Sequence, residues 1–144
     1  MALKALRNIG YGLYVIGSKK GDKLNAQVAN TVFQVTSKPA SVAVSLNKNN
    51  LTHEYIDESK VFSASVLCTA TPLAFIDLFG FRSGRDVDKL DGAAYKIGKT
   101  GAPVILDNAV ACFEARVTQQ IEVGTHTILI GEVVDAETVS KKNA

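Results

Sequence analysis

Apolar residues recur at every second position along much of this chain, which is the spacing of a half-buried β-strand. In residues 111–123, polar side chains occupy one face and the other face carries Phe113, Ala115, Val117, Ile121 and Val123. Five more segments are rich in Val, Ile, Thr, Phe and Tyr, and they cover residues 11–16, 27–36, 41–46, 61–67 and 126–134. The pattern therefore predicts a mainly β protein.

Two short helices are predicted between these strands. The first covers residues 51–56 and has Thr52 as its N-cap. The second covers residues 71–80 and has Thr71 as its N-cap. Residues 81–101 are rich in Gly, Ser, Arg, Asp and Lys, and they are predicted to be irregular. Several strands with two small helices favour a closed or half-closed antiparallel barrel.

Composition predicts one compact domain that covers residues 1–144. The chain is 47% apolar and 21% charged, which places it outside the disordered class. A net charge of +2 does not favour a nucleic-acid surface. Asp77 and Arg82 interrupt the most apolar run, so no membrane span is expected. Cys68 and Cys112 lie among apolar residues and are expected to be buried free thiols, which favours a cytoplasmic location.

Residues that carry side-chain catalysis are scarce. The histidines His53 and His126 occur without a Gly-x-Ser-x-Gly motif, although a triad built on either of them stays open. These histidines and the two cysteines lack the spacing of a metal site, so none is predicted. Gly10 and Gly12 lack the third glycine of a dinucleotide motif, and residues 98–100 lack the first glycine of a phosphate loop.

Amide and hydroxyl side chains gather in two strand-forming stretches. They are Asn25, Gln27, Asn30 and Thr31 in the first stretch, and Ser45, Asn47, Asn50 and Thr52 in the second. One interpretation assigns these side chains to caps and turns. The other assigns them to a binding site, where amides contact a planar heterocycle and the N–H groups of a helix start hold a phosphate.

The same stretches resemble the flavin reductase-like family. Residues 25–31 (Asn-Ala-Gln-Val-Ala-Asn-Thr), followed by Pro39 and the hydrophobic segment 42–45, look like its flavin-binding region. Residues 124–126 (Gly-Thr-His) resemble its Gly-Asp-His motif, with Thr in place of Asp. Residues 79–89 are similar to a narrower group, in which the flavin domain stands alone, as in flavoredoxin-type proteins, or is fused to a rubredoxin, as in high-molecular-weight rubredoxin.

The resemblance implies a homodimeric split β-barrel of Greek-key type, with two or three short helices and one FMN per subunit. The implied cofactor-binding residues are Asn25, Gln27, Val28, Ala29, Asn30, Thr31, Ser45, Leu46, Asn47, Asn50, Leu51, Thr52 and Arg82. Residues 27–31 would line the isoalloxazine ring, residues 45–47 would reach the ribityl chain, and residues 50–52 would hold the phosphate. The phosphate charge would then be neutralised by a nearby cation, for which the candidates are Lys48, Arg82 and Arg85.

The implied activity passes electrons from NADH or NADPH through the flavin to a free flavin or a redox protein, such as a rubredoxin or a flavoprotein oxygen reductase. His126 would stand on the nicotinamide side as the catalytic residue. An alternative is an FMN electron-transfer module that a protein donor reduces, without direct NAD(P)H activity. A third hypothesis, an oligonucleotide-binding barrel without a cofactor, is poorly supported by the charge and the absence of tryptophan.

Overall fold

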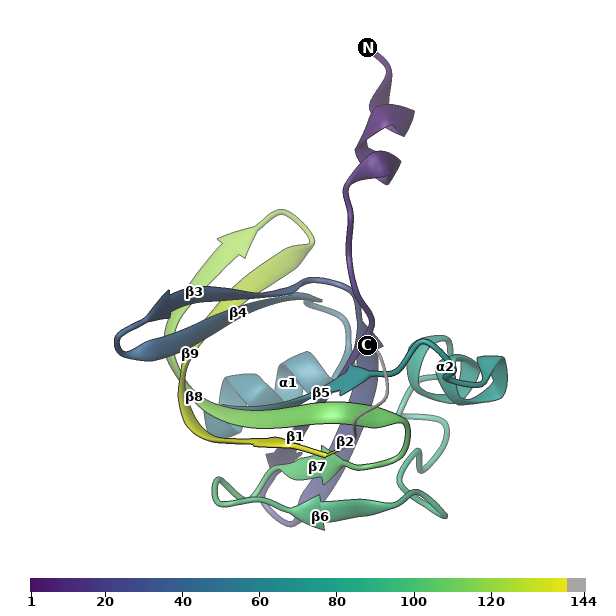
Figure 1. Ribbon diagram of the computed structural model, residues 1–144, viewed down its shortest axis with the longest axis vertical. Coiled ribbons are helices and arrows are strands. Elements are labelled where there is room, and N and C mark those ends of the chain that lie inside the picture. Colours follow the sequence, from purple (N-terminus) through teal and green to yellow (C-terminus); the bar gives the residue numbers. More distant parts are fainter. Residues whose placement is uncertain (140–144) are drawn as a thin grey trace.

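The computed structural model describes residues 1–139, and about half of them lie in strands (Figure 1). The end of the expected domain, residues 140–144, lies outside the described part. The strands are β1 (Tyr14–Lys20), β2 (Lys23–Ala29), β3 (Val32–Ser37), β4 (Ala40–Asn47), β5 (Val61–Leu67), β6 (Tyr95–Ile97), β7 (Pro103–Ile105), β8 (Ala109–Val123) and β9 (His126–Thr138). The helices are η1 (Leu3–Asn8), α1 (Leu51–Ser59) and α2 (Leu73–Gly80).

Seven of the strands form one antiparallel sheet in the order β2-β1-β5-β8-β9-β4-β3. Its two edge strands, β2 and β3, are joined only by residues 30–31, so the sheet curls back toward itself as a half-closed barrel (Figure 1). The main core fills this curl with Ile16, Val44, Phe62 and Leu129, which come from four different strands. The expected mainly β split barrel with short helices is confirmed.

Three sequence predictions about strands are corrected by the structure. Residues 27–36 form two strands instead of one, because the chain leaves the sheet at Asn30 and Thr31. The first predicted strand begins at Tyr14, three residues later than expected. Ile121 and Val123 are 45% and 54% exposed, because the β8–β9 hairpin extends beyond the body of the barrel (Figure 1).

Both predicted helix caps are also wrong. Asn50 and Pro72 are the N-cap residues of α1 and α2, and neither makes a side-chain capping bond. Thr52 lies inside α1, where its Oγ1 accepts a hydrogen bond from Asn25 Nδ2 at 2.9 Å. Thr71 lies before α2 and donates its hydroxyl to the backbone oxygen of Cys68 at 2.6 Å. Each hydroxyl therefore has a tertiary or turn partner that local sequence does not indicate.

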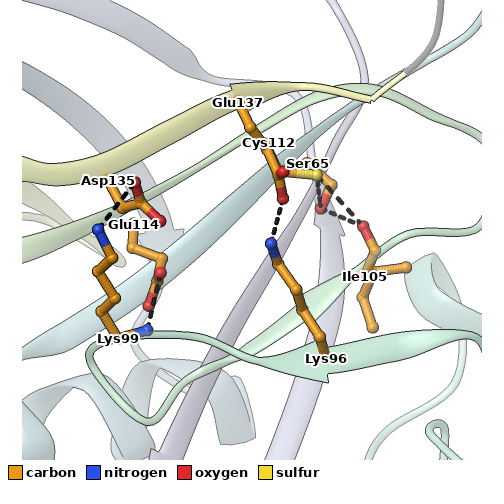
Figure 2. A network of polar contacts seen from close by, with 8 residues as sticks. All are labelled: Ser65, Lys96, Lys99, Ile105, Cys112, Glu114, Asp135 and Glu137. Carbon is orange, nitrogen blue, oxygen red and sulfur yellow. Dashed lines mark hydrogen bonds and ion pairs between the residues drawn. The ribbon is translucent and has the colours of Figure 1, made fainter.

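The region expected to be irregular contains β6, which pairs with β7 in a separate ribbon. The buried carboxylate of Glu114 holds the turn of this ribbon. It accepts the N–H of Lys99 at 3.0 Å and both the N–H and the hydroxyl of Thr100, at 2.9 and 2.6 Å. Figure 2 shows two lysines of the ribbon reaching carboxylates of β9, namely Lys96 to Glu137 and Lys99 to Asp135. Side chains of the main sheet therefore fix the ribbon on its surface.

Candidate functional site

Two cavities lie side by side where the ends of β2 and β4 meet the start of β9 and of α1. Their volumes are about 300 Å³ and about 250 Å³. They share Gln27, Asn50, Gly80 and Phe81 as lining residues, so they form one continuous recess. Cavities that hold small-molecule ligands measure roughly 300–1,000 Å³, and the recess falls within that range. We call the two parts the larger and the smaller cavity.

The larger cavity combines amide and hydroxyl groups with a few apolar side chains. Its residues from β2, from β4 and from the segments that follow them are Gln27, Val28, Ala29, Asn30, Ser45, Leu46, Asn47 and Asn50. Ile76 and Phe81 add apolar surface from α2 and the residue after it. Such walls can contact the faces of a planar ring and also offer hydrogen bonds to its edge.

His126 lies at the exposed edge of the larger cavity. It is the first residue of β9 and stands opposite Asn47, the last residue of β4. Its Nδ1 is 2.8 Å from the hydroxyl of Thr125, the residue in place of the family's Asp. The other histidine, His53, instead pairs its Nε2 with the Thr127 hydroxyl at 2.9 Å and does not line the recess. Of the two histidines, only His126 is therefore placed to meet a molecule bound in the recess.

The smaller cavity ends at the start of α1. Asn50 and Leu51 both line it, and Asn50 has an extended backbone. Among the hydrogen bonds of the described residues, none uses the backbone N–H groups of Leu51, Thr52 or His53. Free N–H groups and the helix dipole make such a helix start favourable for an anion.

Asn25 connects three elements around the smaller cavity. It lies on β2 and donates its side-chain hydrogen bond to Thr52 in α1, and both residues are buried. The loop after α2 packs on its other side, where a Cβ added to Gly84 would lie 2.2 Å from Asn25 Oδ1. Only glycine fits this close approach, so the Asn25 amide and Gly84 together set the position of the loop.

The same loop contributes a buried amine. Lys89 lines the smaller cavity, is 4% exposed, and donates a hydrogen bond from Nζ to the backbone oxygen of Phe79 at 3.1 Å. Burial lowers the pKa of Lys89 to about 8, because desolvation disfavours the ammonium form. The start of a helix and a buried lysine therefore both line the smaller cavity.

The structure brings most of the sequence-predicted residues together. Those that line the recess are Asn25, Gln27, Val28, Ala29, Asn30, Ser45, Leu46, Asn47, Asn50, Leu51, Arg82 and His126. Thr52 does not line it, because its side chain is fully buried behind the wall. Thr31 instead lines a separate cavity of about 800 Å³ beside the N-terminal segment.

Sequence reasoning did not single out Lys89, Phe81, Ser83 and Gly84, which also line the recess. The resemblance over residues 79–89 indicated this loop, but an irregular segment has no periodicity that shows which side chains turn inward. The one sequence feature that could have indicated Lys89 is its position before the apolar Leu90, near the end of a run of charged residues. That signal does not by itself distinguish an inward lysine from a solvated one.

Other expectations concern the rest of the chain. Cys68 and Cys112 are both free and buried, as expected. No helix within residues 1–139 has the length and apolar character needed to cross a membrane. In the same part of the chain, no three His, Cys, Asp or Glu side chains gather so that they could hold a metal ion.

Comparison with known proteins finds relatives along nearly the whole chain. A family model described as the flavin reductase like domain matches residues 6–144. The chain is 52% identical over 136 residues to a high molecular weight rubredoxin of Moorella thermoacetica, a match that covers 94% of this chain and 59% of that protein. It is 50% identical over 137 residues to a ferric-chelate reductase (NAD(P)H) of Archaeoglobus fulgidus, covering 95% and 81%.

The fold is also similar to those of known flavin-binding proteins. The crystal structure of an FMN-binding protein from Thermus thermophilus matches with a TM-score of 0.82 at 26% identity, covering 91% of this chain and 72% of that one. The chain thus spans about three fifths of the rubredoxin relative and most of the other two proteins. Because the family model covers the barrel and the recess, and half of the residues match two relatives, the chain belongs to the flavin reductase-like family.

Proposed function

We propose that this protein is an FMN-containing oxidoreductase that passes electrons from NADH or NADPH to a free flavin or a redox-protein acceptor. The observation that carries the proposal is the shape and chemistry of the recess. Its larger part offers amides and apolar surface, and its smaller part offers a helix start and a buried amine. FMN has a matching arrangement of groups, with a planar heterocycle at one end and a phosphate at the other.

The residues present fit this cofactor. The strand ends around Gln27 and Ser45 would hold the ring, and Asn47 and Asn50 would lie along the ribityl chain. The free N–H groups at the start of α1 would hold the phosphate. When bound, FMN supplies the ability to accept a hydride and to release electrons onward. Thr52 and Asn25 would not contact the phosphate through their side chains. Their hydrogen bond would instead hold the helix start in place against β2.

The chain's contribution to the reaction is then mainly orientation. His126 is exposed at the edge of the larger cavity, so it can contact a nicotinamide that lies over the ring, and Thr125 restrains its imidazole. Close apposition of two rings needs no strong acid or base. Among the residues that the structure describes, no histidine besides His126 and no acidic side chain lines the recess, which agrees with this mechanism.

The names of two relatives support both the proposed electron donor and the proposed electron acceptor. The Archaeoglobus relative is named as an NAD(P)H-dependent ferric-chelate reductase, which supports a nicotinamide donor. The Moorella relative is named as a rubredoxin, which supports a redox-protein acceptor. The same name favours a second candidate, an FMN module that a protein donor reduces without NAD(P)H. Buried reduced thiols at Cys68 and Cys112 agree with a cytoplasmic protein.

A homodimer is the proposed assembly, and the N-terminal segment is its main support. Helix η1 stands away from the barrel (Figure 1), and none of its residues is buried. Leu3, Leu6 and Ile9 are 62–67% exposed there, and Phe33 on β3 is 55% exposed. A second copy of the chain would cover these apolar side chains. Tyr11 lines both the cavity beside this segment and the larger cavity, so the assembly would reach the flavin site.

The first test is equilibrium binding of FMN to the flavin-free protein, followed by flavin fluorescence. One equivalent per chain is expected. Ser45→Phe places a ring in the larger cavity and should weaken binding at least about tenfold, whereas Ser37→Phe, at the exposed end of β3, should leave it unchanged. Equal affinity in the two variants would contradict the placement of the flavin, and a wild-type protein that binds no flavin would contradict the function.

A further inference from the structure

The hydroxyl of Thr125 holds one edge of the His126 imidazole at the turn between β8 and β9. Thr125 Oγ1 lies 2.8 Å from His126 Nδ1, which is a hydrogen-bonding distance. Of the hydrogen bonds within residues 1–139, none uses Nε2, the other ring nitrogen of His126. Because His126 is exposed at the edge of the larger cavity, Nε2 is left for a molecule that enters this cavity.

The backbone fixes the place of this pair. Gly124 turns the chain with a φ of +56°, a conformation that favours glycine. The backbone oxygen of Thr125 accepts the N–H of Lys48 at 2.9 Å, and His126 stands opposite Asn47 in the β4–β9 ladder. The Thr125 hydroxyl is therefore presented to the ring from a turn that is attached to the end of β4.

The surroundings of the pair are uncharged on the side of the cavity. No carboxylate of the described residues lies within 4.0 Å of a His126 ring nitrogen. Glu122 is opposite Thr127 in the β8–β9 ladder, so it lies on the other face of the hairpin, and its carboxylate is 3.8 Å from Lys48 Nζ. The described residues that line the larger cavity include no Asp, Glu, Lys or Arg, and Tyr11 is their one titratable side chain besides His126.

A hydroxyl differs from a carboxylate in two ways as the partner of an imidazole. A hydroxyl can donate a hydrogen bond to an unprotonated ring nitrogen, whereas an ionised carboxylate only accepts. A hydroxyl also has no charge, so it does not favour the protonated ring as a neighbouring carboxylate does. Thr125 stands where the flavin reductase-like motif has Asp, so this chain has a neutral partner at that position.

We propose that Thr125 is a positioning residue for the oxidation of the nicotinamide. Its hydroxyl donates to Nδ1 of His126, so that a neutral imidazole presents Nε2–H to the carboxamide oxygen of the nicotinamide. The inference rests on the proposed function, because it assumes that NADH or NADPH enters the larger cavity. Its own content is the direction of the hydrogen bond and the absence of charge on the pair.

The charge of the pair affects the redox step. The dihydronicotinamide gives a hydride, which is two electrons and one proton, to the flavin, and it is left as a cation while the flavin is reduced. His126 gives up no proton in this step. A neutral imidazole does not oppose the charge that develops on the nicotinamide, whereas an imidazolium without a carboxylate partner does. Histidine changes charge between about pH 5 and 8, so acid should slow the reduction.

Anaerobic stopped-flow spectroscopy of the FMN-loaded protein, with NADH and with NADPH, measures this effect. The wild-type rate of flavin reduction should fall at least about tenfold from pH 8 to 5.5. Thr125→Val keeps the shape of the side chain and removes the hydroxyl, so the rate at pH 8 should fall about tenfold while FMN affinity stays within about twofold. Thr125→Ser should recover most of the rate.

Two further variants separate charge from structure. Thr125→Asp places a carboxylate beside the ring, which balances an imidazolium, so the rate should change less than about threefold between pH 8 and 5.5. Thr118→Val is the matched control, because Thr118 is an exposed residue of β8 whose hydroxyl donates to the backbone oxygen of Ile130 at 3.2 Å. This control should keep the wild-type rate and pH profile.

Nitrogen-15 NMR of the flavin-free protein tests the hydrogen bond without any coenzyme. The two histidines give separate imidazole signals, and His126→Ala identifies those of His126. At pH 8.5 the wild type should carry its ring proton on Nε2, and Thr125→Val should show a mixture of both tautomers. A wild-type ring protonated on Nδ1 would contradict the proposal, even if Thr125→Val does not fold.

The outcomes distinguish this inference from the proposed function. If neither nicotinamide reduces the wild-type flavin, the reductase function is wrong, and the role of Thr125 is wrong with it. If the wild type is reduced and Thr125→Val reacts equally fast, the function stands and the role of Thr125 is wrong. A Thr125→Asp protein with the wild-type pH profile would also contradict the proposal, because the charge of the pair would then have no effect.

Discussion

Lys89 and Cys112 are two buried side chains that desolvation shifts toward their neutral forms. Burial lowers the pKa of the Lys89 amine to about 8, and burial raises the pKa of the Cys112 thiol. The consequences differ, because Lys89 lines the recess and Cys112 packs with Val104 and Ala109. A buried thiol of this kind is an inert part of the core, whereas Lys89 borders a cavity that a ligand can enter.

A contact between the Lys89 amine and the FMN phosphate would make the flavin affinity depend on pH. Below about pH 8 the free protein carries the ammonium, so FMN binds with full affinity. Above about pH 8 the amine must regain a proton when FMN binds, so the dissociation constant of FMN should rise by up to about tenfold per pH unit. The ratio of riboflavin to FMN dissociation constants should therefore fall between pH 7 and about pH 9.5, as titrations by fluorescence would show.

Riboflavin is the control for other titrating groups near Lys89. Charged side chains of the surrounding elements include Arg82 with Asp77, Arg85 with Glu54, and Asp88, which accepts the Leu90 N–H. Asp86 in the same loop and Asp57 and Glu58 in α1 are further ones. Effects of these groups on the ring or on the fold would change the affinity for both flavins. A ratio that stays constant between pH 7 and about pH 9.5 would contradict a contact between the Lys89 amine and the FMN phosphate.

At the scale of elements, sequence pattern predicted the strands that cross the core and failed at the edges. Residues 61–67 form β5 with the expected bounds, because apolar and small side chains continue through the whole strand. The break at Asn30 and Thr31 has no Gly or Pro, since it arises where the sheet curls and β2 passes into β3. The β6 and β7 strands have three residues each, which is too short for periodicity to appear.

The sequence also predicted one part of the candidate site and missed another part. Amides at positions 25–30 could be predicted because a run of them is unusual in a strand. The buried state of Thr52 depends on Asn25 in β2, and the inward direction of Lys89 depends on Phe79 at the end of α2. Contacts of this kind form only in the folded protein, so a linear pattern does not contain them.

The Glu114 carboxylate should be needed for the stability of the β6–β7 ribbon. Glu114→Ala leaves two backbone N–H groups and the Thr100 hydroxyl without their acceptor, and it should lower the free energy of unfolding by about 3 kcal/mol. Glu122→Ala is the control, because its side chain is 79% exposed and lies 3.8 Å from Lys48. That variant should lose less than about 1 kcal/mol. Urea denaturation of both proteins measures the difference, and equal losses would contradict this role.

At the scale of the whole molecule, the barrel carries apolar surface that its own chain leaves uncovered. The exposed side chains lie on η1, on β3 and at the β8–β9 hairpin, and they include Leu6, Ile9, Phe33, Ile121 and Val123. The first two belong to a segment that stands away from the body (Figure 1). Isolated surface apolar residues are ordinary, but a projecting segment with several of them is typical of an interface.

Removal of residues 1–10 should therefore convert a dimer into a monomer. The deletion removes no buried side chain of the described structure, so the barrel should remain folded by circular dichroism. Sedimentation equilibrium of the full chain should give twice the mass of the monomer, and the deletion should reduce it to about one chain. A full chain that is monomeric at high concentration, or a deletion that leaves the dimer intact, would contradict the role of the segment.

A nicotinamide is expected to reduce a flavin held in this recess, and anaerobic spectroscopy tests this reaction directly. The FMN-loaded protein should lose its visible flavin absorption when NADH or NADPH is added without any protein partner. His126→Ala should slow this loss by about tenfold or more while FMN affinity stays nearly the same, since His126 lies at the edge of the cavity. Flavin bands that persist with both nicotinamides would contradict the reductase and support the module reduced by a protein donor.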